Sequence, residues 1–581
     1  MKKFILIYDV LSKKSQSFFW VVLIVSTIGM GLEVIGIGMI MPMIEILIRP
    51  ELVDENSIWY KLLNTFGEKS NFTLIGLCLV VSLFIFKNLY LAFQVNLHSK
   101  FTFDVQVETS SFLFENYLAK PYEFFLRTNS SELLRNTIAE VNSFVGYVMQ
   151  PLLIIISECM VLLAVVFLLL YVEPFACAFA ILFVGLLGWL FHRFTSERVK
   201  DWGNERQKRE GMRIQCLQEG FDGIKALKLI NNNSFINKNF TENTRLGSTA
   251  GQKQYAMQQM PRLLFETLAV LGLAILVVGL SRESNTQTLM PKLGMIAFGL
   301  VRVMPSVARI INSSQSIAYG WPSVRVLQKE LGRWKQQKEN SENNESFEFN
   351  ESFKLEKVFY AYPNAVQDSL TNVSINLQKG SCVGVIGESG SGKSTIVDIA
   401  LGLLKPRKGR ILLDGKDITN FLNQRSWQEL VGYVPQEIYL SDSSLRSNVA
   451  FGIEQSEASD DTILKCLRDA NLEDFVERLP DGLDTMMGER GTRLSGGQRQ
   501  RVGIARALYR NPTLIVFDEA TSALDNETER EVMEAIKDLD GEITVLIIAH
   551  RLTTLRNCDK VVKLDNNHAL SVGSYKEMVN K

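Results

Sequence analysis

The chain has 581 residues, of which 46% are hydrophobic and 22% are charged, and its formal net charge is −1. This length predicts two or more domains, and the composition excludes a disordered chain and a collagen-like fibre. Residues 1–340 carry 34 Lys and Arg against 26 Asp and Glu, a net +8, whereas residues 341–581 carry 28 against 37, a net −9. A basic half is thus joined to an acidic half, which excludes a nucleic-acid binder with one continuous basic face.

The basic half contains six apolar stretches that are long enough to cross a bilayer, which takes about 20 residues of helix. Their approximate cores are residues 18–43, 73–94, 148–172, 175–195, 261–281 and 291–313. The lysines at the N-terminus predict a cytoplasmic start, and the acidic segment 44–72 predicts an outer loop. Six spans return the chain to the cytoplasm near residue 320, so we predict a cytoplasmic acidic half. The long charged segments 95–147 and 196–260 are predicted to be cytoplasmic extensions of the helices.

One segment of the outer loop has a helical pattern. Residues 57–66 place five apolar side chains on one face of a helix, namely Ile58, Trp59, Leu62, Leu63 and Phe66. Such a helix either lies on the membrane surface or packs against the protein itself.

Charges within the predicted spans are informative because each one is costly in lipid unless it is paired or faces water. Four of these charges are cations, at Lys87, Arg262, Arg302 and Arg309. Arg302 and Arg309 are seven residues apart and share one helical face. Together the four would line a cationic cavity for a phosphate or pyrophosphate, which Arg binds bidentately. The alternative is structural, with the cations paired to Glu158 and Glu266 or extended to the interface. For Arg302 and Arg309 we favour the cavity.

In the acidic half, a buried strand predicted over residues 382–386 runs into a glycine-rich loop. Residues 387–394 fit the pattern G-x-x-x-x-G-K-[ST], which in a strand–loop–helix setting is a P-loop that binds phosphate through backbone N–H groups and a helix N-terminus. Lys393 is predicted to reach the β- and γ-phosphates, and the Ser394 hydroxyl to coordinate Mg²⁺. The predicted nucleotide contacts of the loop are Gly387, Glu388, Ser389, Gly390, Ser391, Gly392, Lys393, Ser394 and Thr395.

A second strand, over residues 514–518, ends in the carboxylates Asp518 and Glu519. Asp518 is predicted to hold the Mg²⁺ shell, usually through water, and Glu519 to polarise an attacking water. The alternative is that Asp518 and Glu519 are two unrelated surface acids at a strand end. The P-loop upstream disfavours it.

Between these elements lies Leu-Ser-Gly-Gly-Gln over residues 494–498, which by itself could be a glycine turn that caps a helix. In this order, the motif resembles the signature of ABC-transporter ATPases. The other motifs of that family follow over about 230 residues. They are the adenine-stacking aromatic Tyr362, the Q-loop Gln436, the exporter-specific loop 488–491, the D-loop 522–525 with Asp525, and the switch histidine His550.

The resemblance implies a role for each of these residues. The catalytic residues would be Gln436, Glu519 and His550, and the metal shell would be Ser394, Gln436 and Asp518. In this family the signature residues bind ATP held by the other subunit, which here assigns Ser495, Gly497 and Gln498 to the nucleotide site, together with Tyr362 and Asp525. One chain contains one ATPase and six spans, so the resemblance implies a homodimer that uses ATP and Mg²⁺.

The layout of six spans before the ATPase resembles exporters rather than importers. We therefore expect an α-helical membrane domain over residues 1–325, with coupling helices near 121–135 and 230–239, a linker over 326–347, and an α/β P-loop nucleotide-binding domain over 348–581.

The ATPase motifs do not separate exporters of drugs, lipids, peptides and glycolipids. The membrane cations and the outer-loop helix resemble bacterial flippases of lipid-linked oligosaccharides, although Lys87 stands where Arg would match better. The resemblance implies an ATP-driven flippase of an anionic, polyprenyl-pyrophosphate-linked glycan in the lipid bilayer of the bacterial inner membrane, without a nucleic-acid partner. A general exporter of lipids, drugs or peptides is the alternative. A non-transporting ABC protein is disfavoured because Glu519 and His550 are both intact.

Overall fold

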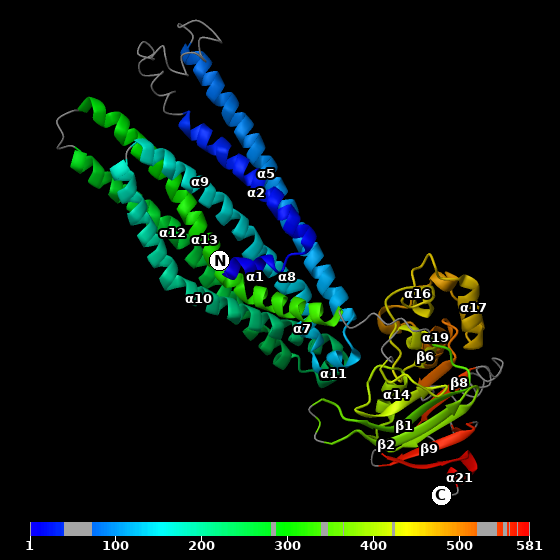
Figure 1. The fold of residues 1–581 in the computed structure, drawn as a ribbon. Helices are drawn as coiled ribbons and strands as arrows, with labels where there is room; N and C mark the ends of the chain where they lie inside the picture. The colour runs from blue at the N-terminus through cyan, green and yellow to red at the C-terminus, as the bar shows by residue number, and fades with distance from the viewer. Residues whose placement is uncertain are drawn as a thin grey trace. The chain divides into compact units, whose positions relative to one another are not determined.

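The structure is a computed structural model. It describes residues 2–39, 72–172, 174–280, 286–338, 347–363, 365, 367–420, 425–519, 543–549, 555–556, 558–565 and 568–579. The chain divides into two compact units (Figure 1). The first comprises Met1–Lys120 and Thr128–Ser341, and the second comprises Pro121–Arg127 and Glu342–Lys581. The predicted outer-loop helix over 57–66 lies outside the described residues.

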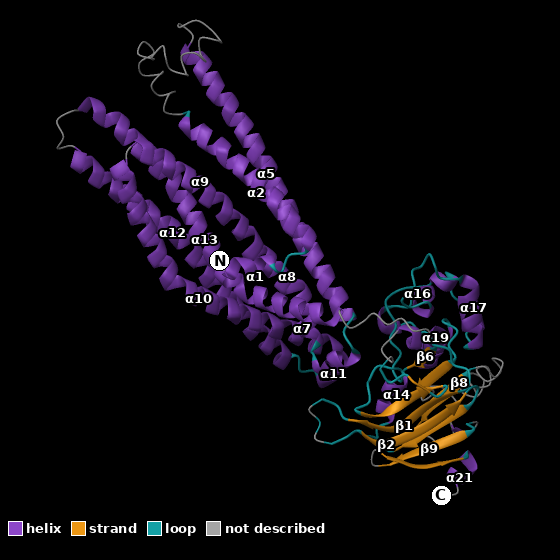
Figure 2. Cartoon of the chain, in the orientation of Figure 1, coloured by secondary structure: helices purple, strands orange, loops and turns teal. Residues whose placement is uncertain are grey.

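The regular structure of the first unit is helical throughout its described residues (Figure 2). The six predicted spans fall on six long helices: α2 (Lys13–Gly38), α5 (Phe72–Leu118), α9 (Gln150–Val172), α10 (Pro174–Asp222), α12 (Ser234–Leu280) and α13 (Thr286–Lys338). The shorter helices are α1 (Lys2–Tyr8), α7 (Ser130–Leu134), α8 (Val141–Phe144) and α11 (Ile224–Ile230), and the π-helical turns are η3 (Arg135–Glu140) and η4 (Val145–Met149).

These helices expose large apolar side chains, as lipid-facing helices do. On α2, Trp20 and Ile24 are 60% and 61% exposed, and on α5, Leu89 is 67% exposed. Within the described residues, three stretches are long and apolar enough to cross a membrane: Lys13–Gly36, Gly76–Leu118 and Ser130–Phe167. The other three predicted spans are helical, and their membrane crossing stays a prediction.

The second unit holds two sheets. A four-stranded antiparallel sheet has the order β2-β1-β4-β5, and a six-stranded sheet has the order β10-β9-β3-β8-β7-β6. Its neighbouring strands are parallel except for the antiparallel pair β9 and β10. The strands are β1 (Ser352–Tyr360), β2 (Leu370–Gln378), β3 (Cys382–Gly387), β4 (Lys408–Leu413), β5 (Lys416–Asp417), β6 (Val431–Val434), β7 (Leu514–Asp518), β8 (Thr544–Ala549), β9 (Lys560–Asp565) and β10 (His568–Gly573).

Helices surround these sheets, and α6 (Tyr122–Arg127) from the membrane half of the sequence is among them. The others are α14 (Lys393–Ala400), α15 (Arg425–Gln428), α16 (Leu445–Val449), α17 (Asp460–Asp469), α18 (Glu473–Glu477), α19 (Gly496–Leu508) and α21 (Tyr575–Val579), with short 3₁₀ turns η5 (Gly482–Asp484) and η6 (Glu489–Gly491).

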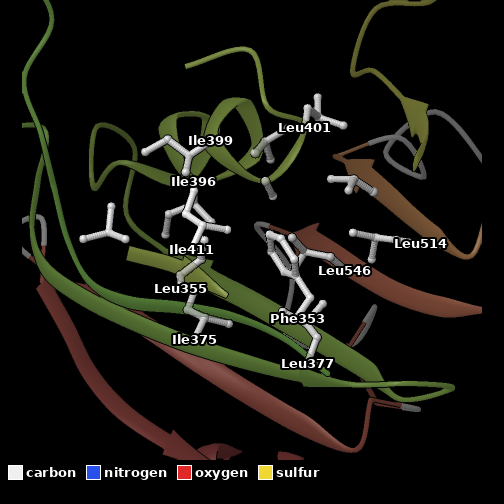
Figure 3. Packing of buried hydrophobic residues seen from close by; sticks show 14 of the residues in the cluster. Phe353, Leu355, Ile375, Leu377, Ile396, Ile399, Leu401, Ile411, Leu514 and Leu546 are labelled. Atoms are coloured by element: carbon white, nitrogen blue, oxygen red, sulfur yellow. The ribbon is translucent and has the colours of Figure 1, made fainter. Parts of the chain in front are cut away.

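The six-stranded sheet separates two apolar clusters, because successive strand residues point to opposite faces. On β7, Leu514 belongs to one cluster and Ile515 to the other. The first cluster contains Ile396 and Ile399 of α14 (Figure 3), whereas the second contains Val502 and Ile504 of α19. Helices α14 and α19 therefore cover opposite faces of this sheet.

Two boundaries differ from the expectation. The linker was expected from residue 326, yet α13 continues to Lys338, because its apolar side chains still pack inside the first unit: Val324 and Leu327 are fully buried. The expected membrane domain also included residues 121–127, which instead group with the ATPase half.

Candidate functional site: a phosphate loop facing two carboxylates

The P-loop joins the end of β3 to the start of α14. Gly390 and Gly392 have φ angles of +84° and +93°, a region that favours glycine. A Cβ at Gly392 would lie 2.5 Å from the Ser369 carbonyl oxygen, so only glycine fits there. The Lys393 ammonium donates hydrogen bonds to the carbonyl oxygens of Gly387 and Glu388, at 2.9 and 3.0 Å. The loop thus concentrates a cation and the N-terminus of a helix at one point, as phosphate binding requires.

Tyr362, the predicted adenine-stacking residue, lies beside this loop. Its hydroxyl is 3.2 Å from Thr395 Oγ1 on α14, and its ring meets Tyr360 edge-on with centroids 5.2 Å apart. The aromatic residue and the P-loop helix are therefore brought together, as the order of motifs predicted.

Asp518 and Glu519 lie at the carboxyl end of β7, on the same sheet edge as the P-loop, since β3 and β7 both flank β8 in parallel. The Gln436 amide donates a 2.9 Å hydrogen bond to Glu519 Oε2. Glu519 has a φ of +51°, and its N–H donates to the Ile548 carbonyl oxygen at 3.0 Å. A left-handed non-glycine residue costs about 1–2 kcal/mol. Two of the three predicted catalytic residues are thus in direct contact.

Asp518 is partly buried and lies next to a second acid, Glu519. Burial, and then the adjacent Glu519, raise the pKa of Asp518, while Tyr433 donates to its Oδ2 at 3.5 Å. Two neighbouring acids, Asp518 and Glu519, at the carboxyl end of β7 favour the binding of a cation.

The predicted Mg²⁺ residues fit that ion by their chemistry. Mg²⁺ prefers hard oxygen donors and keeps several of its waters. Ser394 and Gln436 are exposed and Asp518 is half-buried, so oxygen donors with access to water are present.

The signature segment begins α19. Ser495 is the N-cap, its side chain accepts from the Gln498 N–H at 3.2 Å, and the Gln498 side chain accepts from the Ser495 N–H at 2.9 Å. This reciprocal capping box orders the motif. The segment does start a helix, but the cap is Ser495 and not a glycine turn, since Gly496 and Gly497 lie within α19. Nucleotide contact by Ser495, Gly497 and Gln498 stays a prediction.

Comparisons with known proteins match this site and this fold. Residues 370–522 match the family model described as "ABC transporter". A solved structure of a bacterial Atm1-family ABC exporter with ATP bound superposes with a TM-score of 0.80, at 22% identity and over 96% of both chains. The chain has the fold of an ABC exporter and carries its ATPase. Its P-loop site binds ATP, and its activity is ATP hydrolysis coupled to transport.

Curated relatives are similar to this chain over most of its length. An ATP-dependent lipid A-core flippase of Ralstonia nicotianae is 27% identical over 81% of this chain and 79% of its own length. The protein of the same name from Bordetella avium is 28% identical over 80% of this chain and 78% of its own length.

The ATP site includes an acid that the motifs did not reveal. Burial, with Asp518 adding to it, raises the pKa of Asp398 on α14 to about 6. Burial also raises the pKa of Tyr122 on α6, with Asp398 and Tyr362 adding to it. Asp398 follows Ser394 by one helical turn, and this spacing was the available signal. Helix α6, the predicted first coupling helix, thus lies next to the nucleotide site.

Two of the four cations in the predicted spans, Lys87 and Arg309, are paired with acids, which the cavity hypothesis did not expect. Arg309 Nε lies 2.8 Å from Glu158 Oε1, which is the structural alternative considered for this residue. Lys87 Nζ lies 3.7 Å from Glu33 Oε2, and both side chains are nearly buried, at 11% and 12% exposure. Glu33 was overlooked, although it is an acid within the first span.

The structure describes the remaining predicted site residues only in part. Arg262 lies exposed on α12. Arg302 lies on α13, and the description does not extend to its side chain. His550 and the D-loop with Asp525 lie outside the described residues.

Proposed function

We propose that two copies of this chain form an ATP-driven flippase in the bacterial inner membrane. The proposed cargo is a polyprenyl-pyrophosphate-linked oligosaccharide, an amphiphile with an anionic glycan head. A general exporter of lipids, drugs or peptides is the second candidate.

The fold supports a homodimer. The P-loop leads into α14 and the signature segment begins α19, and these helices cover opposite faces of one sheet. A signature serine that contacts ATP at a P-loop therefore comes from a second copy. Exposed apolar side chains on and after α11 support a partner as well: Leu229, Ile230 and Phe235 are 80%, 69% and 67% exposed.

Each of these residues has a separate role in ATP hydrolysis. Lys393 and the P-loop N–H groups hold the phosphates, and Glu519 accepts a hydrogen bond from the attacking water and polarises it. Gln436 donates to Glu519 and holds its carboxylate in place. Ser394, Gln436 and Asp518 would hold Mg²⁺, which when bound would supply positive charge next to the phosphates. Hydrolysis then releases the two ATPase units from each other, which drives alternating access.

The names of the relatives support a lipid with a sugar head, because lipid A-core and polyprenyl-pyrophosphate glycans share phosphate, sugar and apolar chains. Arg309 supports an anionic head. Its side chain is 47% exposed although it is paired with Glu158, so a phosphate can compete with that carboxylate for the guanidinium.

The observation that carries the ATP-driven function is the Gln436–Glu519 hydrogen bond on the sheet edge that bears the P-loop. The cargo is tested by ATPase activity in nanodiscs with a polyprenyl-pyrophosphate glycan, with lipid A-core, and with an uncharged amphiphile. We expect the glycan to stimulate hydrolysis most, and the Arg302→Ala/Arg309→Ala variant to lose this stimulation while it keeps basal activity. Stimulation by lipid A-core alone would indicate that lipid A-core is the cargo. Stimulation by the uncharged amphiphile alone would favour the general exporter.

A further inference from the structure

A buried cluster of charges joins helical segments of the first unit, and along the chain it begins eight residues after the end of α6. We call it the Glu140 clamp, and it consists of Arg135, Glu140, Ser143, Arg206 and Ser323. The side chain of Glu140 is fully buried, and those of Arg135 and Arg206 are 16% and 14% exposed. Buried charges persist only when they are paired and hydrogen-bonded, so this cluster has a structural or mechanical role.

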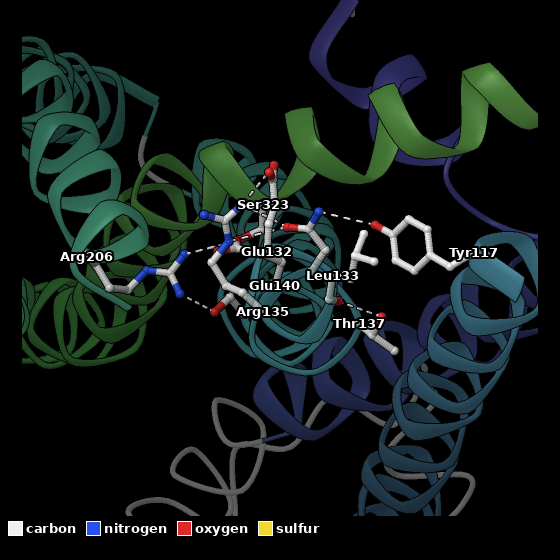
Figure 4. Close-up of polar contacts among 10 residues, drawn as sticks. Tyr117, Glu132, Leu133, Arg135, Thr137, Glu140, Arg206 and Ser323 are labelled. Carbon is white, nitrogen blue, oxygen red and sulfur yellow. Dashed lines mark hydrogen bonds and ion pairs between the residues drawn. The ribbon is translucent and has the colours of Figure 1, made fainter. Parts of the chain in front are cut away.

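Three side chains surround the Glu140 carboxylate (Figure 4), and its hydrogen bonds are accepted by Oε2. Arg135 Nε of η3 lies 3.9 Å from Glu140 Oε1, and Arg206 Nη2 of α10 lies 3.5 Å from Oε2. Ser323 of α13 donates to Oε2 at 2.5 Å. Arg206 also donates to Ser323 Oγ at 3.1 Å and to Ser143 Oγ of α8. One carboxylate thus connects η3, α10 and α13.

The backbones of these segments touch at the clamp. A Cβ at Gly203 of α10 would lie 2.2 Å from the Tyr319 carbonyl oxygen of α13, and one at Gly320 would lie 2.7 Å from Tyr147 Cβ of η4. The rings of Tyr147 and Tyr319 meet edge-on, and the Arg206 guanidinium lies over both, at 5.9 and 5.6 Å from their centroids. Glycine contacts and cation–π contacts therefore reinforce the ion pairs.

The helix that carries Glu140 is irregular on both sides of the clamp. Its π-helical turns η3 and η4 enclose the single α-turn α8. The Thr137 hydroxyl donates to the Leu133 carbonyl oxygen at 2.9 Å, and Ser110 of α5 donates to the Thr137 carbonyl oxygen at 3.1 Å. Such side-chain bonds bend helices, and π-turns often mark functional sites. A bent, wide helix absorbs displacement unless its neighbours hold it.

We propose that the Glu140 clamp is a mechanical joint of the transport cycle. It fixes η3, α10 and α13 as one body, so that a displacement entering at α6 reaches α10 and α13 and is not lost in the π-turns. Chain connectivity supports this, since η3 begins eight residues after the end of α6. Glu140 and Arg206 are positioning residues in this scheme and touch neither ATP nor cargo.

The test measures hydrolysis and helix movement separately. Spin labels replace Trp20 on α2 and Trp189 on α10, both about 60% exposed, and their distance is measured without nucleotide and after trapping with ATP and vanadate. With the clamp intact we expect a nucleotide-dependent shift. Glu140→Gln and Arg206→Gln should retain basal ATPase activity and lose the shift. Glu210→Gln is the matched control, because Glu210 pairs with Arg213 on the same helix at 2.7 Å but is partly exposed.

The double variant Glu140→Gln/Arg206→Gln separates the joint from a folding role. Glu140→Gln leaves Arg206 without its carboxylate, and Arg206→Gln leaves Glu140 with only the more distant Arg135, whereas the double change removes the Glu140–Arg206 pair as a whole. Arg135 keeps a second carboxylate in the double variant, because its Nη2 lies 3.6 Å from Glu132 Oε1. We expect the double variant to recover thermal stability and still lack the shift. A retained shift in that variant, a shift missing in the parent, or hydrolysis lost together with stability would each overturn the proposal. None of these measurements uses the cargo, so failure of the proposed cargo leaves the result readable.

Discussion

The two units of the chain differ in how their charged side chains are arranged. At the ATPase sheet edge the acids Asp398, Asp518 and Glu519 are gathered, and the pKa of Asp398 and that of Asp518 are raised. In the helical unit, Lys87, Arg309 and Glu140 each have an opposite charge within 4 Å. Carboxylates that lie close together favour the binding of a cation and support phosphate chemistry, whereas ion pairs hold helices together. This contrast distinguishes a reaction site from a mechanical site.

The strongest test of this contrast is Glu519→Gln. The change removes the carboxylate that polarises water, so we expect turnover to fall by about 10²–10⁴-fold while ATP binding is retained. Steady-state hydrolysis and equilibrium binding of a labelled ATP measure the two effects. The control is Glu437→Gln, an exposed neighbour of Gln436. Ready hydrolysis by Glu519→Gln would remove this residue from its catalytic role.

Gly392→Ala tests the phosphate cradle. A side chain at φ +93° costs about 1–2 kcal/mol, and the clash with Ser369 adds to it, so ATP binding should weaken about tenfold or more. Gly415→Ala is the control, since Gly415 also has a positive φ, +79°, but has no atom within 4 Å of its would-be Cβ. Equal ATP affinity of the two variants would contradict a close-fitting loop.

In the membrane half, Glu158→Gln tests the pairing of Arg309. This pair is half-exposed, so its disruption should lower the free energy of unfolding by about 1 kcal/mol, between the values for surface and buried pairs. The double variant Glu158→Gln/Arg309→Gln should recover most of the loss. Thermal unfolding in detergent measures both, and additive losses would show that the two side chains act independently.

The smallest expected effect concerns pH. The pKa of Asp398 is raised to about 6 in the folded protein, whereas an unfolded Asp titrates near 4. The folded state therefore binds the proton more tightly, and this group lowers stability as pH rises from about 4 to about 6. Asp398→Asn should remove that fall and raise the free energy of unfolding at pH 7 by about 1 kcal/mol, after allowance for solvent screening.

The unfolding midpoint between pH 4 and 7 checks this expectation, with the exposed Asp442→Asn as control. An unchanged pH profile in Asp398→Asn would assign the dependence to other groups.

The nucleotide site was predictable from the sequence because its geometry is local. A P-loop is one strand, one turn and one helix, and Asp518 comes directly after its strand, so parallel pairing of the strands brings the two together. Glu519 was predicted from the same strand end, whereas Gln436 needed the family resemblance, and the structure places the two side chains in contact.

The partners in the helical unit were less predictable. Glu33 meets Lys87 only because α2 packs against α5, and Arg206 meets Glu140 across 66 residues of sequence. Apolar periodicity identifies the helices but not their contacts. The linker boundary was misplaced for the same reason, since the burial of Leu327 depends on tertiary packing.

The placement of α14 and α19 on opposite sheet faces has a genetic consequence for the proposed homodimer. Each ATP site takes its P-loop from one chain and its signature from the other. A cell that co-expresses a Lys393→Ala chain and a Ser495→Ala chain would form mixed dimers in which one site collects both defects and the other is wild type. Two inactive alleles would then complement each other, whereas both changes placed in one allele would damage both sites of every mixed dimer formed with a normal chain.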